Sequence, residues 1–435
     1  MASLVAIVGR PNVGKSTLFN RLIGERKAII DDISGVTRDR IYGRTEWNGR
    51  EVNVVDTGGF VSGSDDVFEA AIRSQVQIAI EEADVIIFMT DVTTGITDLD
   101  ESVAQMLRKS KKKVVLAVNK VDNSTRQLAA NEFWGLGFDN TFFLSSMTGS
   151  GSGELLDAVI DLLPEQIESE IDEDLPRVSI LGRPNVGKSS FVNALLGEDR
   201  NIVTDIAGTT RDAIHSRYSK FGKDFVLIDT AGIRKKKKVH EDLEFYSVIR
   251  AVKSIDECDV CILMIDATQG LEAQDMAIFS LILKRKRGVI LLVNKWDLVE
   301  KETNTARDFT KTIQEKLAPF SDVPILFISA LEKQRIFKAV EMIETVYENK
   351  IRRIKTSVLN DALQEMTAKY PPPSHRGKLI KIKYVTQLPT KYPAFAFFCN
   401  HPKHVKANYR NYLENQLRER FDFSGVPINV VFKEK

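Results

Sequence analysis

The eight residues Gly-Arg-Pro-Asn-Val-Gly-Lys-Ser occur at positions 9–16 and again, unchanged, at positions 182–189. Each copy follows a short apolar run and precedes an amphipathic segment that ends in glycine. A strand, a glycine-rich turn and a helix are the context in which this pattern binds phosphate, because backbone N–H groups and the helix N-terminus face the anion. The lysine then reaches the β- and γ-phosphates, and the serine hydroxyl reaches Mg²⁺. An unchanged repeat indicates a duplicated nucleotide-binding domain.

Further positions recur at nearly constant spacing. Thr37 and Thr210, and likewise Asp56 and Asp229, are separated by the same stretch of chain as the two phosphate loops, and Asn119 and Asn294 by a slightly longer one. Near-continuous apolar runs, such as 85–89 and 114–118, alternate with segments of helical period. This alternation predicts an α/β fold in each copy, with a mostly parallel sheet covered by helices on both faces. We therefore expect tandem P-loop domains at residues 1–163 and 176–350, joined by an acidic linker at 164–175.

Residues 351–435 follow a different pattern. Apolar periodicity there gives the order α-β-β-α-β, which predicts a small separate α+β domain. This segment holds 16 Lys and Arg residues against 6 Asp and Glu, whereas the rest of the chain holds 45 against 54. A basic domain on an acidic body favours a polyanionic partner, above all nucleic acid. The alternative is a solvated basic face without a partner.

Composition restricts the class of protein. The chain has 435 residues, 43% of them hydrophobic and 28% charged, as in ordinary globular proteins. It contains no apolar run of about 18 residues, so we expect no membrane span. The N-terminus leads into a strand without a basic region, and three cysteines are too few to staple a chain of this size. We expect a cytoplasmic monomer.

Metal-binding residues follow each phosphate loop. A polar segment with Thr37 or Thr210 comes first, and the next apolar strand ends in Asp-Thr-Gly-Gly at 56–59 or Asp-Thr-Ala-Gly at 229–232. A threonine hydroxyl and a strand-end carboxylate can complete Mg²⁺ coordination, while the last glycine donates its N–H to the γ-phosphate. The expected Mg²⁺ ligands are Ser16, Thr37, Asp56, Ser189, Thr210 and Asp229.

The nucleotide base is indicated by Asn-Lys-Val-Asp at 119–122 and Asn-Lys-Trp-Asp at 294–297, each after a long apolar strand. An aspartate there accepts hydrogen bonds from N1–H and the 2-amino group of guanine, which adenine lacks. Leaving such a buried carboxylate unpaired discriminates by about 10⁴-fold or more. The sequence therefore predicts GTP and GDP as ligands, with backbone support from residues 145–146 and 329–330.

The motifs together predict a full set of site residues. Hydrolysis is assigned to Lys15, Thr37, Asp56, Gly59, Lys188, Thr210, Asp229 and Gly232. In the first domain the nucleotide contacts are Gly9, Arg10, Pro11, Asn12, Val13, Gly14, Lys15, Ser16, Thr17, Asp56, Thr57, Gly58, Gly59, Phe60, Asn119, Lys120, Asp122, Ser145 and Ser146. In the second they are Gly182, Arg183, Pro184, Asn185, Val186, Gly187, Lys188, Ser189, Ser190, Asp229, Thr230, Ala231, Gly232, Ile233, Asn294, Lys295, Asp297, Ser329 and Ala330.

Two complete motif sets followed by a small C-terminal domain resemble the EngA/Der family of tandem-domain bacterial ribosome-assembly GTPases. The resemblance covers essentially the whole chain and implies a KH-like third domain. It also implies a GTP-hydrolysing switch in ribosome biogenesis that binds the large (50S) subunit and its rRNA in a nucleotide-dependent way. The alternative is a nucleotide-regulated RNA-binding scaffold, in which one GTPase domain is mainly regulatory and turns over little GTP.

The chain departs from the family pattern at three places. Ser145-Ser146 replaces the usual Ser-Ala, which matters little for a backbone contact. Glu332-Lys333 replaces a Thr-Gly-like turn after Leu331, so the shape of that loop is left open. The last domain has no clear G-x-x-G loop, with which KH folds usually grip the RNA backbone.

Hydrolysis needs a device other than glutamine. Phe60 and Ile233 stand where many GTPases place a water-orienting glutamine, so we expect slow intrinsic hydrolysis. The resemblance implies that Asn12 and Asn185 hold K⁺ beside the phosphates, where the cation stabilises transition-state charge. The alternative is that both asparagines only form the turn.

Two other sequence features, a run of lysines and a pair of cysteines, could also indicate a function. Four lysines at 235–238 fall at the start of the expected second switch segment and indicate either a solvated loop or an RNA contact. Cys258 and Cys261 form a single C-x-x-C pair without a second pair, so we expect neither a metal site nor a redox role.

Overall fold

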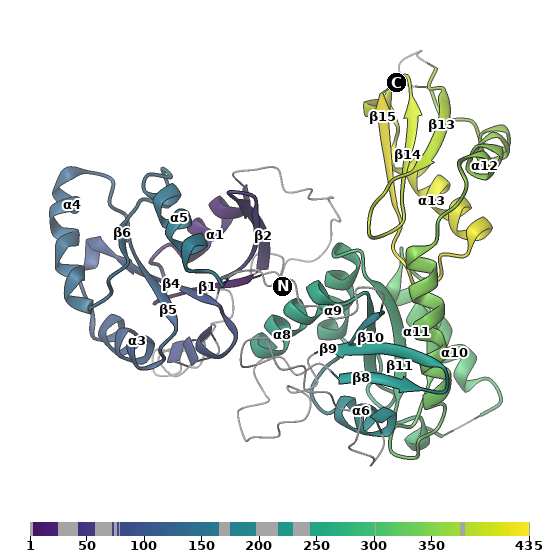
Figure 1. Cartoon of the computed structure of the whole chain (residues 1–435), viewed down its shortest axis with the longest axis horizontal. Helices are drawn as coiled ribbons and strands as arrows, with labels where there is room; N and C mark the ends of the chain where they lie inside the picture. Colours follow the sequence, from purple (N-terminus) through teal and green to yellow (C-terminus); the bar gives the residue numbers. More distant parts are fainter. Residues whose placement is uncertain are drawn as a thin grey trace. The chain divides into compact units, whose positions relative to one another are not determined.

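The computed structural model describes residues 3–24, 42–56, 72–73, 76–77, 79–164, 175–196, 216–228, 244–300, 302–374 and 379–434. It divides into two compact units, residues 1–168 with 248–253 and residues 169–247 with 254–435 (Figure 1). Most of the predicted acidic linker, residues 165–174, lies outside the described residues. Among the residues that are described, no helix combines the length and apolar character needed to cross a bilayer.

The first unit is built on a six-stranded sheet in the order β2-β3-β1-β4-β5-β6. Neighbouring strands are parallel except β2 and β3. The elements are β1 (Ser3–Val8), α1 (Lys15–Gly24), β2 (Tyr42–Trp47), β3 (Arg50–Asp56), β4 (Val85–Asp91), η2 (Val92–Thr94), α3 (Asp98–Lys109), β5 (Lys113–Asn119), α4 (Ser124–Ala129), η3 (Ala130–Leu136), β6 (Thr141–Phe143) and α5 (Ser152–Leu162).

Two apolar clusters fix which helices cover which face of this sheet. Phe19 of α1 and Val159 of α5 pack with Val5 on one face. Val103 of α3 packs with Phe88 on the other face. Every residue of β4 is buried, which explains why the sequence shows it as a continuous apolar run. The predicted mostly parallel sheet with helices on both faces is confirmed.

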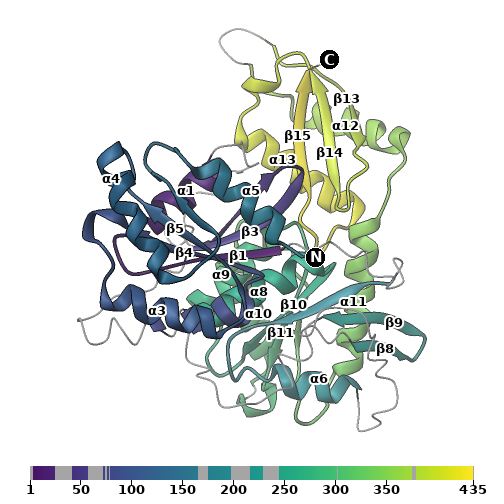
Figure 2. The ribbon, with the colours of Figure 1, turned by 60° about the vertical axis from the view of Figure 1, so that its left-hand side comes forward.

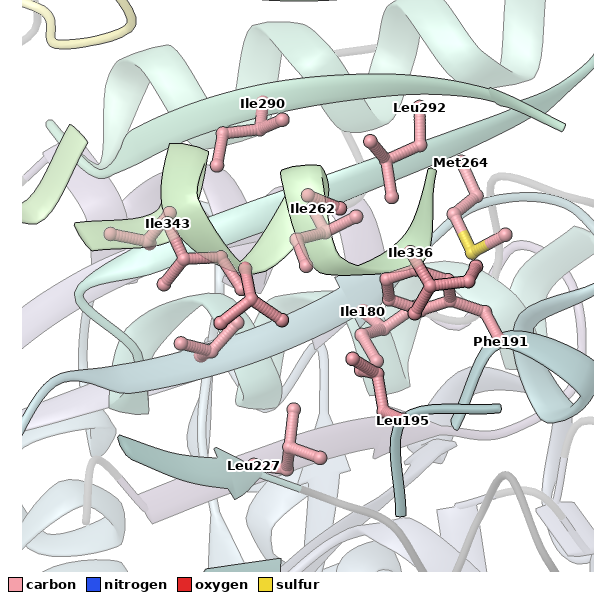
Figure 3. Close-up of a cluster of buried hydrophobic side chains, with 14 of the residues drawn as sticks. Ile180, Phe191, Leu195, Leu227, Ile262, Met264, Ile290, Leu292, Ile336 and Ile343 are labelled. Carbon is pink, nitrogen blue, oxygen red and sulfur yellow. The ribbon is translucent and has the colours of Figure 1, made fainter. Parts of the chain in front are cut away.

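A second α/β domain repeats this architecture with the order β12-β11-β10-β7-β9-β8. Its elements are β7 (Arg177–Leu181), α6 (Lys188–Leu196), β8 (Ser216–Lys220), β9 (Lys223–Ile228), α8 (Glu244–Glu257), β10 (Val260–Asp266), α9 (Ala273–Lys284), β11 (Gly288–Asn294), η4 (Trp296–Leu298), α10 (Thr305–Leu317), β12 (Ile325–Phe327) and α11 (Ile336–Ile351). Residues of these elements form one buried apolar cluster, in which Figure 3 shows Ile343 of α11 near Ile262 and Ile290, and Phe191 of α6 near Ile336 of α11 and Met264 of β10.

Each sheet has one antiparallel edge strand that the apolar pattern did not predict. β2 pairs with β3 and β8 pairs with β9 as hairpins with two-residue turns. Edge strands carry polar residues, so they lack the continuous apolar signal of the buried strands. Asn48-Gly49 in the first hairpin is nevertheless a strong turn signal, because both residues adopt positive φ (49° and 77°).

The C-terminal segment forms the predicted α-β-β-α-β domain. Its elements are α12 (Thr356–Lys369), β13 (Ile382–Gln387), β14 (Ala394–Cys399), η5 (Pro402–His404), α13 (Ala407–Phe421) and β15 (Asn429–Glu434). β14 lies between antiparallel β13 and parallel β15 (Figure 2). Leu363 of α12 and Leu413 of α13 pack with Phe395 and Phe397. The apolar positions Tyr409, Leu413 and Leu417 of α13 are therefore core.

The loop after α13 joins this domain to the core of the second α/β domain. Val426 is buried in the same apolar cluster as the strands of that domain. Gly425 accepts a hydrogen bond from Val289 N (2.7 Å) and donates one to Asp322 O (2.8 Å). These bonds bring the loop to the start of β11 and the segment before β12.

Of the charged side chains beside this junction, Arg418 makes a contact across it. Lys350, at the end of α11, is buried and pairs with Asp259 at 2.5 Å. The Arg418 guanidinium lies 4.5 Å from the centre of the Phe320 ring.

Cys258 and Cys261, on either side of Asp259, are buried with their sulfurs 3.2 Å apart, and burial raises the pKa of Cys261.

Gly425→Ala tests this junction. Gly425 has φ 74°, and an added Cβ would lie 2.8 Å from Val289 O and 2.9 Å from Val346 Cγ2. Gly222 has φ 72° but open space around it, so Gly222→Ala measures the backbone strain alone, about 1–2 kcal/mol. We expect Gly425→Ala to lower the urea unfolding midpoint clearly more than Gly222→Ala. Equal shifts would show that the junction tolerates the extra methyl group.

Candidate functional site

The first phosphate loop connects the buried β1 to α1, and its shape requires glycine at both ends. Gly9 has φ 147° and Gly14 has φ 103°. A Cβ at Gly9 would overlap the Met89 carbonyl oxygen, and a Cβ at Gly14 would overlap the Asn119 amide. The loop therefore packs directly against the ends of β4 and β5.

The second phosphate loop has the same geometry. Gly182 and Gly187 have φ 140° and 98°, close to the values in the first loop. A Cβ at these positions would overlap Met264 O and the Asn294 amide, which are the equivalent atoms of the second sheet. The two loops are thus alike in their packing as well as in their sequence.

The loop lysine is held inside the phosphate loop. Lys15 Nζ donates hydrogen bonds to Gly9 O (2.8 Å) and Arg10 O (2.7 Å), and the side chain is buried. Burial lowers the pKa of Lys15 to about 8, although Asp56 acts in the opposite direction. Lys188 Nζ contacts the equivalent carbonyls of Gly182 (2.7 Å) and Arg183 (2.6 Å). A phosphate group at the loop would provide the negative charge that stabilises the protonated lysine.

The predicted magnesium ligands of the first domain meet at one point. Ser16 Oγ, in the first turn of α1, donates to Asp56 Oδ2 at 2.6 Å. Asp56 is the last residue of β3 and is buried. A hydroxyl and a carboxylate oxygen are donors of the kind that Mg²⁺ prefers, so this pair fits the metal. In the second domain Ser189 occupies the equivalent position at the start of α6.

In each domain a single asparagine joins the phosphate loop to the loop that begins at residue 145 or 329, here called the base-binding loop. Asn119, at the end of β5, donates from Nδ2 to Val13 O (2.7 Å) and accepts at Oδ1 from Ser146 N (2.8 Å). Asn294, at the end of β11, donates to Val186 O (2.8 Å) and accepts from Ala330 N (2.9 Å). Both asparagines are 3% exposed. They position the loops that meet the nucleotide.

An ion pair fixes the lysine that follows each of these asparagines. Lys120 has φ 66° and pairs with Asp91 at 2.5 Å, and Lys295 has φ 61° and pairs with Asp266 at 2.5 Å. Burial acts to raise the pKa of Asp91, but hydrogen bonds from Lys120 and Thr93 outweigh it and hold the pKa below its ordinary value. The lysine stem is thereby fixed beside the predicted guanine position.

The predicted guanine readers stand just beyond these lysines. Asp122 pairs with Arg126 at 2.6 Å and accepts from Asn123 Nδ2 at 3.0 Å. Asp297 lies at the start of η4, and its carboxylate makes no hydrogen bond with the residues that the structure describes. Both carboxylates follow an asparagine and lysine that are already fixed, which is the arrangement a base reader needs.

Comparison with known proteins decides the family. Residues 4–120 and 177–295 match the profile described as a 50S ribosome-binding GTPase (MMR_HSR1), and residues 353–433 match the KH-domain-like C-terminal profile of EngA bacterial GTPase enzymes. GTPase Der of Flavobacterium johnsoniae is 59% identical over 434 residues, which covers 100% of this chain and 99% of the relative. GTPase Der of Christiangramia forsetii is 56% identical over 435 residues, with both chains covered in full. The chain belongs to the GTPase Der (EngA) family.

Family membership confirms the GTPase fold, the tandem arrangement and the KH-like third domain that the sequence predicted. It also makes Mg²⁺-bound guanine nucleotide the ligand class of the two phosphate loops. Several predicted residues lie outside the described part of the chain. These are Thr37, Thr57, Gly58, Gly59, Phe60, Thr210, Asp229, Thr230, Ala231, Gly232, Ile233 and the lysines at 235–238.

The arginine of each phosphate loop turns toward a neighbouring helix. Arg10 Nε contacts Asp100 Oδ2 at 3.2 Å, at the start of α3. Arg183 Nε contacts Asp275 Oδ2 at 2.9 Å, and its Nη1 contacts Glu272 Oε2 at 2.6 Å. Both arginines were predicted as nucleotide contacts. Their guanidinium groups brace the loop against α3 and α9, and their contact with nucleotide stays a prediction.

The second base-binding loop keeps the turn of the first. Ser145 N donates to Ser150 O at 2.9 Å, and Ser329 N donates to the equivalent Gln334 O at 3.4 Å. The Glu332-Lys333 sequence therefore does not change the shape of the turn. In the first domain Arg21 supports the loop further by donating to Ser146 O at 2.7 Å.

Sequence reasoning missed Asp91 and Asp266. A signal was present, because the two aspartates are separated by the same stretch of chain as Asn119 and Asn294, and both end an apolar strand. Arg21 carried no such signal, since Ala194 occupies the equivalent position of α6.

The lowered pKa of Lys15 predicts proton-coupled binding. In the free protein this lysine is protonated below about pH 8 and loses its proton above it. Nucleotide phosphates favour the charged form, so binding at pH 9 takes up close to one proton, and affinity falls up to about tenfold per pH unit above pH 8. Below pH 7 Lys15 is already charged and takes up none.

Calorimetric titration with GDP in buffers of different ionisation enthalpy measures this uptake. A chain with Lys188→Ala isolates the first site. Equal proton uptake at pH 7 and pH 9 would contradict the lowered pKa of Lys15.

Proposed function

We propose that this GTPase is a switch in ribosome biogenesis that binds the large (50S) subunit and its rRNA in a nucleotide-dependent way, in the bacterial cytoplasm and as a monomer. The observation that carries the proposal is the pairing of two guanine-type sites of matching geometry with a basic C-terminal domain. The description of the matching profile as a 50S ribosome-binding GTPase supports the same partner.

We assign the site residues the roles that their sequence motifs predict. Lys15 and Lys188 neutralise the β- and γ-phosphates, and the carboxylates of Asp122 and Asp297 read guanine. Mg²⁺ is held by the serine that opens each helix, with the threonine and aspartate that complete its coordination. These ligands are Ser16, Thr37 and Asp56 in the first domain and Ser189, Thr210 and Asp229 in the second. Gly59 and Gly232 donate backbone N–H groups to the γ-phosphate. Mg²⁺ supplies charge neutralisation along the phosphates when it is bound.

Nucleotide-dependent subunit binding is tested by co-sedimentation of the full chain with 50S subunits in GDP, GTP and a non-hydrolysable GTP analogue. A switch with an ordinary coupling energy changes the affinity about 5- to 150-fold between states. Equal pelleting in GDP and the analogue would contradict the proposal.

The substitutions Lys15→Ala and Lys188→Ala distinguish the switch from the scaffold alternative. GTP turnover is measured for each variant and for the unaltered chain. Each should reduce turnover at its own site by about 10²-fold or more, because a preorganised cation on the phosphates is lost. If only one substitution lowers kcat, the other domain is regulatory.

We further propose that hydrolysis is stimulated by K⁺ held near Asn12 and Asn185. Both residues adopt the left-handed conformation, with φ 64° and 62°, and both are exposed beside a phosphate loop. Asparagine tolerates this conformation well, so the backbone alone is also a sufficient reason for its presence. An amide oxygen is a suitable ligand for K⁺. A test therefore has to distinguish K⁺ binding by the amide side chain from the role of asparagine in forming the turn.

Asn12→Gly and Asn185→Gly make this separation, because glycine keeps the turn and removes the amide oxygen. In KCl the unaltered chain should hydrolyse GTP faster than in NaCl at the same ionic strength. The double variant should bind GDP normally and lose the difference between the two salts. Stimulation that persists in the double variant would leave the asparagines with a turn-forming role only.

A further inference from the structure

An exposed phenylalanine occupies a turn that favours asparagine or glycine. Phe221, at the tip of the β8–β9 hairpin, has φ 56° and its side chain is 74% exposed. The first domain has Asn48 at the equivalent place in the β2–β3 hairpin, with φ 49°. Both central residues of this turn type need positive φ, which a bulky side chain disfavours. Folding alone therefore favours asparagine at position 221.

A second exposed aromatic ring lies against the first. Phe337, in the first turn of α11, is 44% exposed, and its ring centre lies 5.2 Å from that of Phe221 in an edge-to-face arrangement at 86°. Figure 1 shows the β8–β9 hairpin beside α11. Aligning the two base-binding loops on Ser146 and Ala330 places Gly153 opposite Phe337. The second domain thus exposes two rings at positions where the first domain has asparagine and glycine.

Positive charge gathers around these rings. In the same alignment, Lys333, Arg335 and Lys338 replace residues without positive charge, and all three are exposed. Their counterparts in the first domain are Gly149, Gly151 and Glu154. Lys333 and Arg335 keep positive φ (55° and 60°) where the first domain has glycine.

Acidic residues lie on the same surface. Glu332 and Glu341 are exposed nearby, while Glu344 pairs with Lys223. In the same alignment Glu154 of the first domain is opposite Lys338, whereas Asp157 is opposite the equally acidic Glu341. The second domain is therefore more basic and more aromatic than the first at this place, and it accepts three strained backbone positions there.

We propose that Phe221, Phe337, Lys333, Arg335 and Lys338, here called the hairpin–α11 surface, bind single-stranded RNA. Unpaired bases stack on exposed aromatic rings, and lysine and arginine hold the phosphates. A protein partner of ordinary composition would not require this concentration of cations around two rings. The inference rests on the proposed function and names a part of the chain, outside the basic C-terminal domain, that contacts rRNA.

The test is the affinity of the full chain for a fluorescein-labelled, unstructured oligoribonucleotide of about 12 nucleotides, a length within the usual site size. Phe221→Asn with Phe337→Ala should weaken binding about tenfold, because base stacking is lost. The double variant should keep its GTPase activity, and its unfolding midpoint should stay equal or rise, since asparagine accepts the turn. Leu128→Asn, an equally exposed apolar residue (74%) of the first domain, is the matched control and should change nothing.

Charge is tested separately. Lys333→Gly with Lys338→Glu should reduce the slope of log affinity against log salt, whereas the phenylalanine double variant should keep the slope and lose affinity. A 4-thiouridine oligoribonucleotide should crosslink to peptides that contain Phe221 or Phe337. Crosslinks confined to residues 351–435, or unchanged affinity of the folded phenylalanine double variant, would overturn the inference.

Three further outcomes separate this inference from the proposed function. If the unaltered chain binds 50S subunits and the phenylalanine double variant binds them equally well, the hairpin–α11 surface is wrong and the switch stands. If the double variant loses binding to intact subunits but not to protein-free rRNA, the surface recognises a ribosomal protein and the RNA assignment is wrong. If the unaltered chain does not bind subunits at all, the proposed function fails, whatever the oligoribonucleotide result.

Discussion

Each nucleotide site depends on one buried carboxamide. Asn119 and its counterpart Asn294 donate to the phosphate loop and accept from the base-binding loop, at 2.7 and 2.8 Å in the first domain and 2.8 and 2.9 Å in the second. A donor and an acceptor on one planar group allow a single side chain to do both. The close approach of this group also explains why Gly14 and Gly187 have no room for a side chain. Because the asparagine is itself the last residue of a buried strand, the sheet sets the distance between the phosphate end and the base end of the site.

The position of a residue relative to the ends of strands and helices also decided whether its role could be predicted from the sequence. Residues that act at a strand end or a helix start, such as Lys15, Asp56 and Asn119, were predictable because local pattern places them at one edge of a parallel sheet. The direction of Arg10 was not predictable, since its partner Asp100 lies 90 residues away and no local pattern connects them. The edge strands were missed for a different reason, because their polar faces interrupt the apolar runs that mark the buried strands. The switch segments lie outside the described residues, so their roles still rest on sequence.

A comparison of the two duplicated domains shows which contacts both of them keep and which contacts differ. The loop lysine reaches the first loop carbonyl at 2.8 Å in one domain and 2.7 Å in the other, and the bridging asparagine reaches its loop carbonyl at 2.7 and 2.8 Å. Support farther from the nucleotide differs, because Arg21 braces the first base-binding loop and alanine stands at the equivalent position in the second. The loop itself keeps its turn even where Lys333 replaces glycine. A strained backbone conformation retained without glycine shows that hydrogen bonding within the loop is strong enough to hold the residue there.

The C-terminal domain contacts the first end of a strand of the second domain whose other end lies in the nucleotide site. β11 begins at Gly288 and Val289, which bonds to Gly425 of the C-terminal domain, and ends at Asn294 in the nucleotide site. All of its residues are buried, and β10 and β12 flank it on either side. Displacing one end relative to the other would break backbone hydrogen bonds in the core, which cost about 1–3 kcal/mol each when left unmade. The contact with Gly425 and the site residue Asn294 therefore lie at opposite ends of one buried strand, so the C-terminal domain and the guanine end of the second site are connected through the sheet rather than through a surface loop.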